Sequence, residues 1–226
     1  MKKIARKLLS FSMGAAIFSG LPFLGWGLGD PQGFLQNSAR AGYVLMMLML
    51  TVLVVLFVPE EGRGHGVGKK LVNRQKWAVI LLQILSLAIV IFGPYCDRRE
   101  LAVMGDGVAV RWIGLGTVFV GFSLMNWAVI ALKNQFSVDV TIQENHQLIT
   151  TGLYSYVRHP RYLGLILFLS GTSLVFRSWM AFIFAVASVL VLIWRIRDEE
   201  TLMRQEFADT WEEYTKRSWR LIPYVY

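Results

Sequence analysis

Residues 162–194 read YLGLILFLSGTSLVFRSWMAFIFAVASVLVLIW, and Arg177 is the only charged side chain among them. The arginine divides the stretch into apolar runs of 15 and 17 residues. Each run is shorter than the roughly 20 residues that a helix needs to cross a bilayer. Local thinning of the bilayer, or arginine and tryptophan side chains at the helix ends, accommodates such short helices. The stretch therefore predicts a tight, short helical hairpin inside a membrane.

Four further blocks without charged residues precede this hairpin, and each is long enough to span a bilayer. They cover residues 8–29, 41–59, 77–96 and 112–132. Only 17% of the 226 residues are charged and 55% are hydrophobic, whereas about 25% of residues are charged in a typical soluble domain. The predicted fold is all-α, a polytopic membrane bundle of about six transmembrane helices with a short C-terminal hairpin and a cytoplasmic tail helix.

The first apolar block has a competing interpretation as a cleaved signal peptide, because it follows a basic start and precedes small residues at Ala39 and Ala41. The block is 22 residues long, whereas the apolar core of a signal peptide has about 7 to 15 residues. The small residues also lie well past its end. The pattern favours a membrane helix, and whether that helix is retained in the mature protein stays open.

The distribution of basic residues predicts the topology. Of the 23 Lys and Arg residues, 18 lie in the N-terminus, in the loop 60–76, in the connector 133–161 and in the tail after residue 194. The remaining five lie in the alternate segments, at Arg40, Arg98, Arg99, Arg111 and Arg177. The positive-inside rule then places both termini in the cytoplasm. Since the basic residues are spread over four juxtamembrane segments, a nucleic-acid partner is not expected.

Polar and aromatic residues gather at both ends of the hairpin. Residues 146–164, HQLITTGLYSYVRHPRYLG, lead into its first helix, and Arg195 and Glu199 follow its second helix. The two ends lie on the same side of the membrane because the helices are antiparallel. Arg195 and Glu199 are four residues apart and share a helix face. This pattern is compatible with a pocket for a charged small molecule, although each residue taken singly is more typical of an interfacial collar of basic and aromatic residues.

Three other chemistries have little support. Metal binding needs more ligands than two histidines near the hairpin and Cys96, which lies toward the opposite side. Neither a serine nor a cysteine lies in a nucleophile elbow. The predicted spans carry no charged residue at mid-membrane depth to mark an ion path. We therefore predict no metal site.

The C-terminal region resembles the isoprenylcysteine carboxyl methyltransferase and phospholipid methyltransferase superfamily. The similarity covers about residues 134–223. It rests on the order of several short motifs, which are His146-x-Leu148, Gly152-x-Tyr154, Arg158-His159-Pro160-x-Tyr162-x-Gly164, Glu199-Glu200, Phe207, Tyr214 and Pro223. The resemblance implies two regions, the N-terminal membrane helices in residues 1–132 and a methyltransferase-like catalytic region in residues 133–226.

The resemblance also implies S-adenosylmethionine as the cofactor, a cytoplasm-facing site and a lipophilic acceptor that enters from the bilayer. Arg195 matches the family's acceptor-contacting arginine. Arg161 stands where the family usually has a small or apolar residue, so a cofactor contact there is expected through the backbone. The cofactor-binding positions would be His146, Gln147, Leu148, Ile149, Tyr154, His159, Pro160, Arg161, Tyr162 and Glu199.

The acceptor and two alternative functions remain open at this point. A carboxylate acceptor is ionised at pH 7 and needs no base, whereas an amine or alcohol needs one, such as His159 or Glu199. The tail from Arg197 to Tyr226 also resembles membrane sterol reductases that use NADPH. However, the adjacent Glu199 and Glu200 fit the methyltransferases better. A non-catalytic membrane partner that keeps the same scaffold is the third possibility.

Overall fold

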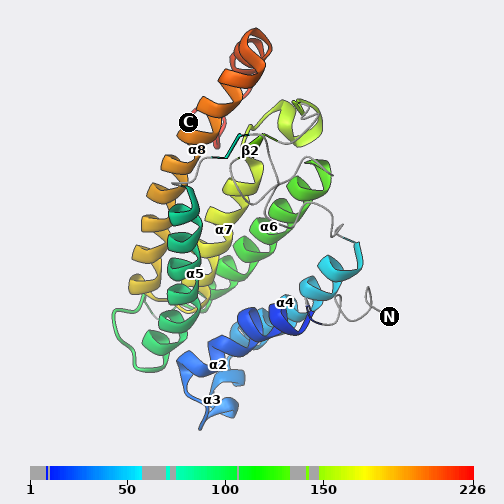
Figure 1. The fold of residues 1–226 in the computed structure, drawn as a ribbon. Coiled ribbons are helices and arrows are strands. Elements are labelled where there is room, and N and C mark those ends of the chain that lie inside the picture. The colour runs from blue at the N-terminus through cyan, green and yellow to red at the C-terminus, as the bar shows by residue number, and fades with distance from the viewer. Residues whose placement is uncertain are drawn as a thin grey trace.

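The computed structural model describes residues 9, 11–57, 70–71, 75–105, 107–132, 141–142 and 148–226. Helices dominate this part of the chain (Figure 1). The elements in order are the π-helix η1 (Ala16–Gly20), α2 (Leu21–Trp26), α3 (Pro31–Leu35), α4 (Ser38–Phe57), β1 (Lys70–Leu71), α5 (Gln75–Arg98), α6 (Val108–Leu132), β2 (Thr141–Ile142), the 3₁₀-helix η3 (Gly152–Ser155), α7 (Pro160–Val175) and α8 (Trp179–Lys216). The two short strands pair antiparallel, with Lys70 opposite Ile142.

Within the described residues, four helices are long and apolar enough to cross a membrane, namely α4, α5, α6 and α8. The predicted all-helical membrane fold is confirmed to this extent. The first and fifth predicted spans form shorter apolar helices, at Phe11–Trp26 and Pro160–Val175. The first one ends at Trp26 because Gly27 has φ 115°, and Asp30 then caps α3 by accepting from the Gly33 N–H. The count of six spans stays a prediction.

Helices α6 and α7 pack closely against each other, and glycines lie at their contact. Gly114 and Gly121 lie seven residues apart on α6, and Gly164 and Gly171 lie seven apart on α7. A Cβ on Gly121 would come within 2.5 Å of the Phe168 nitrogen. Because these glycines have no side chains, the backbones of α6 and α7 can approach this closely. The predicted contact between α7 and α8 is present, but the glycine face of α7 packs against α6, and α8 packs mainly against α5.

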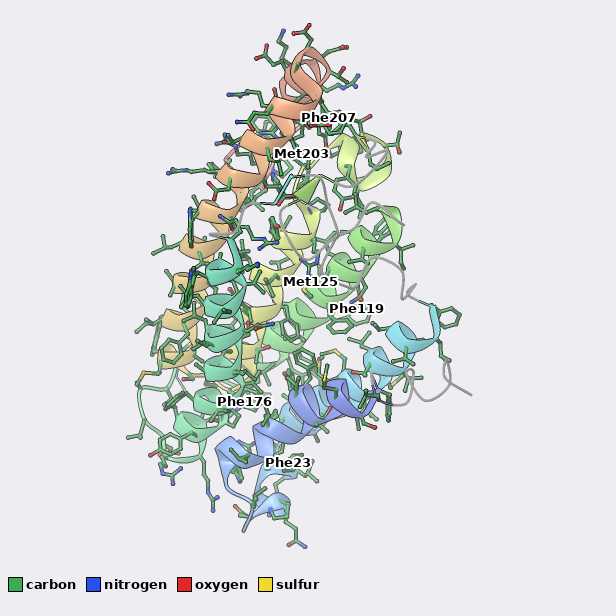
Figure 2. The ribbon with its side chains drawn as sticks, viewed as in Figure 1. Phe23, Phe119, Met125, Phe176, Met203 and Phe207 are labelled. Carbon is green, nitrogen blue, oxygen red and sulfur yellow. The ribbon has the colours of Figure 1, made fainter. Side chains whose placement is uncertain are left out.

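Helix α8 is much longer than the second half of a short hairpin. Its apolar part, residues 179–194, lies beside α5, and its polar part continues to Lys216. Figure 2 shows Met203 and Phe207 on the portion that extends beyond the ends of α5 and α7. The predicted polar helix after Trp194 is thereby confirmed. It is interrupted at Ala208, whose backbone has φ 42° and ψ −116°.

A buried ion cluster lies at the end of the bundle that holds the α7–α8 turn, away from the polar part of α8. Asp97 of α5 is 3% exposed and binds three arginines. Arg111 of α6 donates to both carboxylate oxygens at 2.7 Å, Arg40 of α4 donates at 3.0 Å, and Arg177 of the α7–α8 turn donates at 3.1 Å. Each guanidinium also donates to at least one backbone carbonyl. This cluster joins α4, α5, α6 and the α7–α8 turn.

Candidate active site

The candidate site lies at the end of the bundle where α8 extends past its neighbours (Figure 1). Helix α7 begins there at Pro160, which has no N–H to leave unsatisfied and whose fixed φ suits a first helical turn. His159 precedes it as the N-cap. This start places Tyr162 in the first turn of α7, facing α8.

Three predicted site residues form one chain of hydrogen bonds. Arg195 Nε donates to the hydroxyl of Tyr162 at 2.7 Å. The same hydroxyl donates to Glu199 Oε2 at 2.7 Å. Arg195 and Glu199 project from one face of α8, as their spacing predicts, and the Tyr162 phenol joins them from α7. We call this set the Arg195–Tyr162–Glu199 triad.

Two further predicted residues share the electrostatic environment of the triad. The side chain of Arg161 interacts with Tyr162, Glu199, Arg195 and Tyr154. Burial raises the pKa of the Tyr154 phenol, the charge of Glu199 raises it further, and Arg161 partly offsets both effects. Tyr154 therefore stays protonated and donates to the Ala128 carbonyl oxygen at 3.2 Å. The site holds two guanidinium groups near one carboxylate, which favours an anionic ligand.

Glu200 faces away from the triad and serves as an anchor. Its Oε1 accepts from Arg158 Nε at 2.9 Å, and its Oε2 accepts from Arg220 Nε at 2.8 Å. His159 Nε2 lies 3.5 Å from Oε1. Burial alone would raise the pKa of Glu200, but the neighbouring His159 and Arg158 outweigh this effect and lower the pKa to about 2. The sequence shows only that the adjacent Glu199 and Glu200 must point to different sides of a helix, and the partners of Glu200 lie too far away along the chain to be predicted from it.

The C-terminal segment returns along α8 to the connector that precedes α7 (Figure 1). The N–H groups of Arg158 and His159 donate to the carbonyl oxygens of Trp219 and Arg220, at 2.7 and 3.1 Å. The Tyr214 hydroxyl donates to the Tyr154 carbonyl oxygen at 2.6 Å. The tail thereby holds the predicted cofactor-binding segment in place.

The remaining predicted site residues have different positions. Leu148 and Ile149 are half-buried in the segment that leads to η3. The ring of His159 stacks on that of Tyr162, with centroids 5.5 Å apart, although its Nε2 faces Glu200. Pro160 contributes the start of α7. The predicted positions His146 and Gln147 lie outside the described residues.

The residues present suit a polar ligand such as S-adenosylmethionine. Within the described part of the chain, Nε1 of Trp211 is buried and has no hydrogen-bond partner, whereas Nε2 of His159 faces Glu200. Buried polar groups usually bind water or a ligand when the protein supplies no partner. Trp211 lies on the part of α8 that extends past its neighbours. Its N–H, the carboxylate of Glu199 and the guanidinium of Arg161 offer donors and an acceptor for a zwitterionic nucleoside.

Fold and site together define a polytopic helical membrane protein with a cluster of buried charged residues at one end of its bundle. The predicted resemblance to the isoprenylcysteine carboxyl methyltransferase superfamily is confirmed, because residues 112–205 match the model of the isoprenylcysteine carboxyl methyltransferase (ICMT) family. A solved structure of a eukaryotic intramembrane Ras methyltransferase ICMT superimposes with a TM-score of 0.55 at 16% identity. The superposition covers 93% of this chain and 74% of that one, and it shows the shared fold.

Curated relatives carry the same family name. The chain is 31% identical over 123 residues to a probable protein-S-isoprenylcysteine O-methyltransferase of Oryza sativa subsp. indica, covering 51% of this chain and 62% of the rice protein. It is 31% identical over 114 residues to the protein-S-isoprenylcysteine O-methyltransferase of Schizosaccharomyces pombe, covering 49% of this chain and 48% of the yeast protein. The chain thus matches about half to three fifths of the length of these relatives.

The sterol-reductase alternative has narrower support. A Delta(14)-sterol reductase of Arabidopsis thaliana is 30% identical over 83 residues, which are 35% of this chain and 22% of the reductase. The similarity to methyltransferases therefore extends over more of the chain.

Proposed function

We propose that the protein is an integral membrane methyltransferase that transfers a methyl group from S-adenosylmethionine to the carboxylate of a lipophilic acceptor. The observation that carries this proposal is the Arg195–Tyr162–Glu199 triad, with Arg161 beside it. The family match and the names of the relatives support a methyltransferase. The apolar helices support an acceptor that resides in the bilayer.

Each residue of the site has a distinct role in this proposal. Arg195 holds the anionic acceptor with its guanidinium, and Tyr162 keeps that guanidinium aligned with Glu199. His146–Ile149, Tyr154, His159–Tyr162 and Glu199 would hold the cofactor, which supplies an electrophilic methyl group when bound. Because such a transfer is an in-line displacement, the protein contributes mainly alignment and the exclusion of water.

A carboxylate is the acceptor class that this arrangement favours. The Nε2 atom of His159 faces Glu200, and Glu199 already accepts from Tyr162. Neither group is therefore well placed to take a proton from an amine or an alcohol. A carboxylate is ionised at neutral pH and needs no such step. The guanidinium of Arg195 would also bind it directly.

We further propose that the site faces the cytoplasm. The positive-inside distribution of Lys and Arg supports both termini on that side, together with the connector and the tail. S-adenosylmethionine would then be available to the site from the cytosol.

Calorimetry on the purified protein in lipid nanodiscs tests the cofactor. S-adenosylhomocysteine, the demethylated product, should bind with a Kd of about 1–10 μM, and NADPH should show no binding. The reverse preference would support the sterol-reductase alternative. Binding of neither compound would support a non-catalytic partner protein.

Two variants separate the roles of the triad. Glu199→Gln keeps the size of the side chain and removes its charge, so cofactor affinity should fall. Arg195→Lys keeps the charge but loses the planar fork, so the KM for the acceptor should rise while cofactor affinity changes little. Unchanged cofactor binding and turnover in both variants would show that the site is misplaced.

A further inference from the structure

Trp211 lies on the segment of α8 that follows the interruption at Ala208. Its side chain is 3% exposed. Its ring packs edge-on against Tyr214 at a centroid distance of 5.6 Å. Tyr214 in turn donates to the carbonyl oxygen of Tyr154, a predicted cofactor-binding residue. Trp211 therefore packs on the face of α8 that meets the connector.

The indole N–H of Trp211 is a buried donor without a hydrogen-bond partner in the described part of the chain. Indole can only donate, and leaving a buried donor unpaired is costly. A purely structural aromatic residue at this position would not need that N–H group. Phenylalanine would fill an apolar contact without the cost. The unpaired donor is thus the feature that points to a ligand.

We propose that Trp211 is a further cofactor-binding residue, whose indole N–H donates to the nucleoside part of S-adenosylmethionine. This inference rests on the proposed function. The charged groups of the site, Arg161, Arg195 and Glu199, gather around Tyr162 on the first turn of α7. Trp211 lies twelve residues beyond Glu199 along α8 and packs against the Tyr214 ring. A neutral donor in aromatic surroundings suits a nucleoside better than it suits an amino-acid carboxylate.

The interruption of α8 at Ala208 explains why Trp211 faces the connector that precedes α7. A residue with φ 42° inside a helix changes the direction of the segment that follows it. Trp211 comes three residues later and Tyr214 three residues after that, so both turn the same face toward the connector. Phe207, on the other side of the interruption, is half-buried.

The test is calorimetry with S-adenosylhomocysteine and with 5′-methylthioadenosine, which keeps the nucleoside and lacks the amino-acid group. Trp211→Phe should weaken the binding of both compounds by about five- to tenfold, as expected for one neutral hydrogen bond. Trp179→Phe, at an exposed indole in the first turn of α8, is the matched control and should bind like the wild type. A loss with S-adenosylhomocysteine alone would overturn the assignment to the nucleoside.

A second variant removes the donor without changing the shape of the side chain. Replacement of the Trp211 indole by benzothiophene, with sulfur in place of N–H, should weaken nucleoside binding to the same extent. The thermal midpoint of the ligand-free protein should stay equal or rise, because a buried unpaired donor has been removed. Wild-type affinity in this variant would reject the proposal. Absence of binding by the wild type itself would instead reject the proposed function.

Discussion

The hydroxyl of Tyr162 donates to Glu199 Oε2 at 2.7 Å while it accepts from Arg195 Nε at the same distance. The phenol thus links a carboxylate and a guanidinium that stand one helical turn apart on α8. Arg195 is 3% exposed. A buried guanidinium held in one orientation can bind an anionic acceptor with little further loss of side-chain freedom.

Removal of the Tyr162 hydroxyl tests whether its hydrogen bonds to Arg195 and Glu199 matter for activity. Tyr162→Phe keeps the ring that stacks on His159 but removes both hydrogen bonds. Hydrogen bonds to charged groups contribute about 1.5–3 kcal/mol, so kcat/KM should fall by about ten- to a hundredfold. The measurement is methyl transfer by the purified variant in nanodiscs. Tyr156→Phe is the matched control, because Tyr156 is 72% exposed. Equal activity of the two variants would contradict a role for the Tyr162 hydroxyl.

The glycine contacts between α6 and α7 predict a stability effect that depends on position. A Cβ on Gly121 would lie 2.5 Å from the Phe168 nitrogen and 2.6 Å from the Gly164 oxygen. Gly121→Ala should therefore destabilise the protein by about 1–3 kcal/mol, because backbone must move. On the same helix, a Cβ on Gly116 would meet nothing within 4 Å. Gly116→Ala should be neutral or stabilising by up to about 1 kcal/mol. Thermal unfolding in detergent gives both values, and equal effects would contradict the close crossing.

The anchor residue Glu200 predicts a pH-dependent difference. Its pKa in the folded protein is lowered from the usual 4.5 to about 2. Its ionised form therefore stabilises the fold fully above about pH 4.5, and this contribution is lost as the pH falls toward 2. The thermal midpoints of wild type and Glu200→Gln should differ at pH 7 and converge as the pH falls below 4.5. Glu212→Gln, at an exposed position on α8, should match the wild type throughout. A difference as large at pH 2 as at pH 7 would contradict this role of Glu200.

The backbone at Ala208 predicts a stabilising substitution. With φ 42°, the alanine Cβ is crowded, whereas glycine adopts positive φ without that cost. Ala208→Gly should raise the free energy of unfolding by about 1 kcal/mol. The same change at Ala187, in the regular part of α8, should lower it by about 1 kcal/mol. If both substitutions destabilise the protein, α8 continues without interruption at residue 208.

Much of the helical layout follows from the sequence, since charge-free runs of about 20 residues leave few alternatives in a membrane. The spacing of Arg195 and Glu199 also predicts their common helix face, and the structure confirms it. Both are local patterns, with partners on one helix.

Contacts between distant segments were not predictable in this way. In the sequence, Arg40, Arg111 and Arg177 are only three of the five basic residues in the segments predicted to lie outside the cytoplasm. In the structure, all three bind Asp97. The pairing of α7 with α6 depends on glycines that match only when two separate helices are aligned. Adjacency in sequence predicts the contact of α7 with α8, but it does not predict the closer packing of α7 on α6.

Methyl transfer to matched acceptors tests whether the protein methylates a lipophilic carboxylate. The purified protein in nanodiscs is incubated with methyl-labelled S-adenosylmethionine and a prenylated cysteine. One acceptor carries a free carboxylate, a second carries a carboxamide, and a third carries an amine in the same place. We expect a base-labile methyl ester with the carboxylate alone, and about ten- to a hundredfold less of it with Tyr162→Phe. Labelling of the amine, or no labelling of the carboxylate, would contradict this function.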